Sequence, residues 1–115
     1  MSDAWNEEER GPKLALIERP KRTIWKYQIP VLEDFEIELP KNSKIIRFGN
    51  EGGMLWLWAV VRPDNPKETR RLLAFKTGAE IPEGKMKYLG MAPIFIQAEL
   101  MLYYFEPISS RKEQS

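Results

Sequence analysis

One stretch, residues 54–62, constrains the fold more than any other part of the chain. It reads Met-Leu-Trp-Leu-Trp-Ala-Val-Val-Arg, so apolar side chains occupy both sets of alternate positions. A strand at a sheet surface alternates apolar with polar residues, whereas a strand with two apolar faces is covered on both. Turn-forming residues flank the stretch at 50–53 and 63–66, which gives it the length of a strand rather than a helix. We therefore expect it to be the central strand of a small sheet whose second face is closed by another layer or another subunit.

Segments on either side of this stretch also have the patterns of β-strands. The clearest alternation places Phe35, Ile37 and Leu39 on an inner face. Between them an acidic row is expected to face outward, and it consists of Asp34, Glu36 and Glu38. A Gly-rich turn before the central strand predicts a hairpin there. Strands are expected at residues 24–29, 35–39, 44–49, 68–77, 85–91 and 94–105.

The last of these segments is ambiguous between helix and strand. Residues 97–102 contain fair helix formers, whereas the β-branched and aromatic residues around them favour a strand, and we predict a strand with a bend near Gln97. With no strong helix elsewhere, the sequence predicts an all-β fold, a small antiparallel sandwich or open barrel of about six to seven strands. This single β domain is expected to span residues 23–106, between a mobile N-terminal arm at 1–22 and a polar tail at 107–115.

The composition excludes several classes of function. Lys and Arg number 18 against 17 Asp and Glu, and the net charge of +1 gives no field that favours nucleic acid or an acidic membrane as a partner. Cysteine and histidine are both absent, which removes the usual nucleophile, general base and metal ligands. We therefore expect a protein that is not an enzyme and holds no metal or cofactor. No signal peptide and no stretch of roughly 20 apolar residues is found, so a cytoplasmic location is expected.

An ordered set of short motifs runs through residues 24–106. It reads Ile-Trp-Lys-Tyr-Gln-Ile-Pro from residue 24, Phe-Glu-Ile-Glu-Leu-Pro from 35, Leu-Trp-Ala-Val-Val from 57, Thr-Arg-Arg from 69, Thr-Gly from 77, Tyr-Leu-Gly from 88 and Tyr-Phe-Glu from 104. In this order the motifs resemble a family of small uncharacterised proteins carried mainly by bacteriophages and prophages. The resemblance implies a phage accessory protein in a bacterial host, without an assigned reaction. Where the family commonly has Asp this chain has Arg62, and where it often has His this chain has Ala79, so a histidine-dependent site would be lost here.

The candidate site lies around residues 70–78. Arg70 and Arg71 lead into a strand that ends at a Thr-Gly loop, and a guanidinium fork with loop amides suits an anionic ligand. Aromatic side chains from neighbouring strands would offer a stacking surface for a base. The predicted ligand-binding residues are Arg70, Arg71, Lys76, Thr77, Gly78, Trp56, Trp58 and Tyr88.

In an alternative interpretation, the same residues stabilise the fold and bind no ligand. Consecutive strand residues alternate, so Arg70 is expected on the face of Leu72 and Arg71 on the face of Leu73. In this alternative the tryptophans belong to the core, and the arginines form ion pairs with nearby acids, Glu68 or Glu80.

Two functional hypotheses follow. The leading one is a non-enzymatic phage accessory binding protein, a counter-defence factor that sequesters a nucleotide-like signalling molecule. The alternative is a protein–protein interaction module that inhibits a host defence protein through a strand edge or the acidic row. The strands carry more aromatic residues than one small sheet can hide, among them Trp56, Trp58, Tyr103 and Tyr104. We therefore also expect a homo-oligomer, by default a symmetric dimer.

Overall fold

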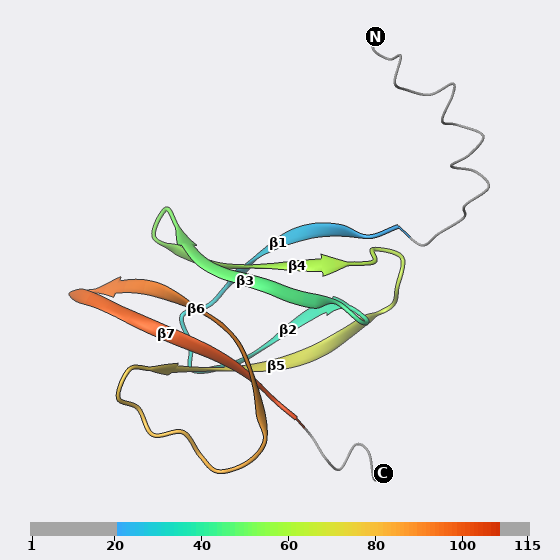
Figure 1. Cartoon of the computed structure of the whole chain (residues 1–115). Helices are drawn as coiled ribbons and strands as arrows, with labels where there is room; N and C mark the ends of the chain where they lie inside the picture. The colour runs from blue at the N-terminus through green and yellow to red at the C-terminus, as the bar shows by residue number, and fades with distance from the viewer. Residues whose placement is uncertain (1–20, 109–115) are drawn as a thin grey trace, which may run out of the picture.

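Seven antiparallel strands in two sheets make up residues 21–108, the part of the chain that the structure describes (Figure 1). In this computed structural model the strands are β1 (Thr23–Ile29), β2 (Asp34–Pro40), β3 (Lys44–Glu51), β4 (Met54–Val61), β5 (Lys67–Lys76), β6 (Met86–Ile96) and β7 (Ala98–Pro107). The first sheet has the order β1-β4-β3 and the second the order β2-β5-β7-β6. Residues 21–108 contain no helix, so the all-β prediction is confirmed. The predicted arm and tail lie almost entirely outside the described residues.

A two-residue turn joins β3 to β4. Gly52 and Gly53 have φ angles of 65° and 83°, the left-handed conformation that a type I′ hairpin turn requires at both central positions. The side-chain oxygen of Asn50 accepts a hydrogen bond from the Gly53 N–H at 3.2 Å. The predicted hairpin is confirmed, and its register pairs Glu51 with Met54.

Strand β4 is the central strand of the first sheet, as predicted. Its inward side chains are all buried, namely Leu55, Leu57, Ala59 and Val61. Trp56, Trp58 and Val60 face the other way and are half-buried. No described strand forms the expected second layer over this face. Instead Lys26 and Arg47 cover the two indole rings, because their stems pack along apolar surface and their cations are attracted to aromatic faces.

The core lies between the two sheets and centres on Tyr104 of β7. Its ring stacks on Phe48 of β3, with ring centroids 4.2 Å apart and an interplanar angle of 3°. Phe35 of β2 meets the same ring edge-on at 6.4 Å. Since aromatic side chains bury large areas, the stack of Phe48 on Tyr104 joins the two sheets, and Phe35 extends this aromatic contact within the second sheet. The inward orientation predicted for β2 is confirmed, with Phe35 and Leu39 buried and Ile37 partly buried.

Residues 94–105 are strand rather than helix, but the bend expected at Gln97 is a complete reversal of the chain. Gln97 has a φ angle of 68°, and its neighbours Ile96 and Ala98 are paired with each other in the register of β6 and β7. One residue in the left-handed conformation therefore turns the segment into a hairpin. Pro93 does not interrupt β6, because β6 is an edge strand where a missing N–H is tolerated.

Candidate functional site

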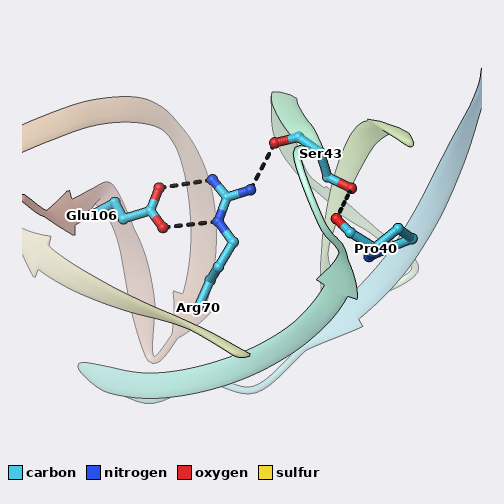
Figure 2. A network of polar contacts seen from close by, with 4 residues as sticks. All are labelled: Pro40, Ser43, Arg70 and Glu106. Atoms are coloured by element: carbon cyan, nitrogen blue, oxygen red, sulfur yellow. Dashed lines mark hydrogen bonds and ion pairs between the residues drawn. The ribbon is translucent and has the colours of Figure 1, made fainter. Parts of the chain in front are cut away.

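Arg70 on β5 is the centre of a polar network that joins the two sheets (Figure 2). Its Nε and Nη2 donate to the two carboxylate oxygens of Glu106 on β7, both at 2.8 Å. Its Nη1 donates to the carbonyl oxygen of Ser43 at 2.7 Å, and the Ser43 hydroxyl donates to the Pro40 carbonyl oxygen at 2.6 Å. The hydrogen bonds with Glu106 raise the pKa of Arg70 above its ordinary value. Because Ser43 directly precedes β3, the network fixes the start of this first-sheet strand to the second sheet.

Arg71 points to the opposite face of the same sheet, since consecutive strand residues alternate. Its Nε and Nη2 donate to the carboxylate of Asp34 on β2 at 2.9 and 2.7 Å. Both side chains are more than half exposed, at 56% and 52%, whereas those of Arg70 and Glu106 are 16% and 21% exposed. The hydrogen bond with Arg71 lowers the pKa of Asp34. The two arginines therefore form two separate ion pairs in different surroundings.

Neither ion pair uses an acid that is close to the arginines in sequence. The sequence suggested Glu68 or Glu80, whereas the observed acids lie on β7 and β2, the two strands that flank β5 in the sheet. The two guanidinium groups also do not converge on one ligand. The arrangement favours a structural role for Arg70 over a shared anion-binding fork.

The loop residues of the predicted site lie at the end of β5. Thr77 and Gly78 form an exposed turn, in which Gly78 has a φ angle of 91°. Lys76 and Arg71 both line a hollow of about 350 Å³, and Glu80 lines it too. The Arg71 side chain in this hollow is already bonded to Asp34, and Glu33 lines the hollow as well, so of the described residues Lys76 is the one cation left here for an anion, among several acids.

Tyr88 belongs to a different hollow, of about 260 Å³, beside Arg70. Lys44 and Lys87 also line this hollow, whereas the ring of Tyr88 packs against that of Phe105 on the outer side of the sheet. The predicted site is thus divided between the two sides of the second sheet.

The two tryptophans of the predicted site line neither hollow. Trp56 and Trp58 lie on the outer face of the first sheet. The Lys26 Nζ is 4.3 Å from the centroid of the Trp56 ring, and the Arg47 Cζ is 4.3 Å from that of Trp58. We name this surface the tryptophan face, which comprises Lys26, Arg47, Gly49, Trp56 and Trp58.

The outer face of the second sheet carries a continuous group of apolar side chains that the sequence did not single out. We name it the aromatic face, which comprises Leu73, Phe75, Tyr88, Met91, Phe95, Met101, Tyr103 and Phe105. The ring centroid of Phe105 lies 5.7 Å from that of Phe75 and 5.4 Å from that of Tyr88. On the edge strand β6, the side chains of Tyr88, Met91 and Phe95 are 51%, 50% and 66% exposed. No strand within residues 21–108 packs over this face.

The acidic row borders the aromatic face. Asp34 is paired in register with Leu73, and Glu36 with Arg71, so the row shares the outer side of the second sheet. Glu36 and Glu38 are exposed, and neither forms an ion pair with any residue between 21 and 108. The outer side therefore combines an apolar area with a negatively charged border.

Within the described residues, no three His, Cys, Asp or Glu side chains are grouped to hold a metal ion, and no helix is long and apolar enough to cross a membrane. The fold and these surfaces define a small two-sheet β-domain with an aromatic surface on each outward side. Residues 20–115 match a family described as a domain of unknown function, DUF7352, and the chain belongs to this family. Neither the curated proteins nor the solved structures contain a significant match.

Proposed function

We propose that the protein is a non-enzymatic binding module that docks on a partner protein through its aromatic face. The observation that carries this proposal is the continuous apolar surface over β5, β7 and β6, on which three side chains are at least half exposed. Large contiguous apolar patches are rare on soluble monomers and mark interaction sites. Tyr, Phe and Met, which dominate this face, are also enriched in protein interfaces.

The border of the face specifies the chemistry of the partner. Glu36 and Glu38 present carboxylates that form no ion pair with a described residue, while Asp34 is already paired with Arg71. Complementary charges steer association and fix the orientation of two proteins. We therefore expect a partner with an apolar strip next to Lys or Arg side chains.

A second candidate function is the binding of an anionic, nucleotide-like signalling molecule. The hollow beside Arg70 favours it, because Lys44 and Lys87 line this hollow and would meet a phosphate. Arg70 adds charge to this hollow but few free donors, since its fork is bonded to Glu106.

The resemblance to phage and prophage proteins gives both candidates a biological setting. In that setting the protein acts in the cytoplasm of an infected bacterium as a counter-defence factor. It would occupy either a host defence protein or the nucleotide-like signal of that defence. A second copy of this chain would also cover the aromatic face, in keeping with the expected homo-oligomer.

Capture from bacterial lysate with matched variants tests the docking proposal. The immobilised full chain is compared as wild type, as Met91→Glu/Phe95→Glu on the aromatic face, and as Ile24→Glu/Ile46→Glu on the first sheet. All four substituted side chains are exposed, at 44% or more, so each variant should fold. We expect a partner that is retained by the wild type and the first-sheet variant and lost by the aromatic-face variant. Equal retention by all three would reject the aromatic face as the docking surface.

A further inference from the structure

The tryptophan face is a second outward surface, on the first sheet, that the proposed docking function leaves unused. Trp56 and Trp58 are two residues apart on β4, so both indoles point outward from backbone positions about 6.7 Å apart. Lys26 of β1 is paired in register with Trp58 on one side, and Arg47 of β3 on the other. Both flanking strands thus contribute a cation to the same short row of aromatic rings.

Gly49 allows the Trp58 ring to lie against strand β3. A Cβ atom on Gly49 would lie 3.3 Å from Cζ3 and 3.5 Å from Cη2 of the Trp58 ring. A larger side chain at this position would therefore push the ring away from the sheet. With Arg47 Cζ 4.3 Å from the ring centroid, a cation covers one face of the indole. A ligand that displaced this cation would therefore contact the face of the Trp58 ring rather than its edge.

The charge of this surface is locally positive. Glu51 is bonded to Lys26, which lowers the pKa of Glu51. Arg47 forms no ion pair with any residue between 21 and 108. Although the net charge of the whole chain is only +1, this surface combines two cations with a single acid.

We propose that the tryptophan face binds phosphate-linked nucleobases, either within single-stranded nucleic acid or as free nucleotides. Aromatic side chains stack on any base, and neighbouring cations hold the phosphates, in single-strand sites that do not depend on sequence. The base replaces Lys26 or Arg47 over an indole ring, and the displaced cation contacts the phosphate. The two tryptophans are separated by about twice the 3.4 Å rise of a stacked strand, which suits two bases that are not stacked on each other. The bases of a duplex are enclosed in their own stack, so a duplex should not bind in this way.

Fluorescence anisotropy of a labelled short oligodeoxythymidylate tests this proposal on the full chain. The variants are Trp56→Leu, which removes one stacking ring, and Lys26→Gln/Arg47→Gln, which removes charge but keeps both indoles. Trp25→Leu is the matched control, because Trp25 is paired with the inward residue Ala59 and so lies on the opposite side of the same sheet. We expect Trp56→Leu to weaken binding about tenfold or more, and Trp25→Leu to bind as the wild type does. The double Gln variant should bind more weakly and respond less to added salt.

Competition by thymidine monophosphate, inorganic phosphate and a duplex of equal length completes the test, with a melting curve for each variant. Much tighter binding of the oligonucleotide than of the mononucleotide supports a strand as the ligand, and similar affinities support a free nucleotide. The proposal is overturned if the wild type binds neither at low salt, or if the duplex binds as tightly as the single strand. It is equally overturned if inorganic phosphate competes as well as the mononucleotide, or if Trp25→Leu loses as much affinity as Trp56→Leu. Should Trp56→Leu fail to fold, the double Gln variant still decides whether this face binds the strand.

Discussion

Arg70 and Glu106 form a bidentate ion pair whose side chains are only 16% and 21% exposed. The next residue on β5, Arg71, forms a bidentate ion pair of the same geometry with Asp34. This second pair lies on the outer side of the sheet, and both of its side chains are more than half exposed. Buried charges that lose their partner are costly, whereas exposed pairs contribute little. Arg70 and Arg71 are adjacent and form the same kind of ion pair, but we expect them to contribute different amounts to the free energy of unfolding.

Replacing the two arginines separately should reveal this difference. Arg70→Ala should lower the free energy of unfolding by about 2–3 kcal/mol, because it leaves the carboxylate of Glu106 partly buried without its donors. Arg71→Ala should change stability very little, since Asp34 remains hydrated. Urea unfolding of the two variants beside the wild type measures both effects.

Arg70→Lys provides the control for charge alone. A lysine keeps the positive charge but cannot form the bidentate contact, so only part of the lost stability should return. Equal destabilisation by Arg70→Ala and Arg71→Ala would contradict the conclusion that Arg70 stabilises the fold by connecting the two sheets.

The opposite orientation of the two arginines could be predicted from the sequence, but their partners could not. Alternation along a strand already placed Arg70 with Leu72 and Arg71 with Leu73, which argues against one shared fork. The acids that bind them lie 36 and 37 residues away. The alternation of residues along a strand does not predict which strands lie beside β5. The sequence could therefore suggest only acids that are close to the arginines in the chain as their ion-pair partners.

Tyr104 is expected to tolerate the loss of its hydroxyl. The ring is fully buried, and its hydroxyl oxygen has no hydrogen-bond partner among the described residues. Because an unpaired polar group is unfavourable in a core, Tyr104→Phe should leave stability at pH 7 unchanged or raise it by up to about 1 kcal/mol. Thermal unfolding at neutral pH measures this, and a large loss of stability would show that the hydroxyl has a partner.

The same residue predicts a loss of stability at alkaline pH. Burial raises the pKa of Tyr104 from 10.0 to about 12, so the folded state holds the phenol proton more tightly than the unfolded state does. Its contribution is complete below pH 10 and is lost as the pH rises from 10 towards 12. Tyr104→Phe should therefore flatten the fall in stability over this range. Identical pH profiles for the wild type and Tyr104→Phe would contradict this explanation.

Gly90 is expected to be sensitive to the smallest enlargement. A Cβ atom there would lie 2.9 Å from Cδ1 of Phe48, the ring that stacks on Tyr104. Gly90→Ala should therefore cost about 1–3 kcal/mol, the usual cost of overpacking a core. In a Phe48→Leu background the additional cost should be smaller, because the clashing ring is gone. A fully additive double variant in urea unfolding would argue against this contact.

Self-association is expected to depend on the aromatic face. Where a second copy rather than a different protein covers the exposed rings, light scattering of the wild type gives at least twice the mass of one chain at micromolar concentrations. Met91→Glu/Phe95→Glu should shift the mass towards that of a single chain, whereas Ile24→Glu/Ile46→Glu should not. A monomeric wild type would show that a second copy does not cover the aromatic face, and a different protein would then be the expected partner.

The surfaces were harder to predict than the strands. Residues 54–62 were recognisable as a central strand, but an apolar second face does not show what covers it. Here the cover comes from Lys26 and Arg47 on the two neighbouring strands. Similarly, alternation in β7 makes both sides apolar, and only the sheet order shows that Tyr104 is buried while Tyr103 faces outward.

Site-specific photocrosslinking shows whether partner proteins dock on the aromatic face. A photoreactive phenylalanine derivative is placed at Phe95 on the aromatic face or at Ile24 on the first sheet, two exposed apolar positions. Each full chain is then irradiated in bacterial lysate. We predict a defined crosslinked protein from the probe at position 95 and none from the probe at position 24. No crosslink at position 95, or the same products from both positions, would contradict docking through the aromatic face.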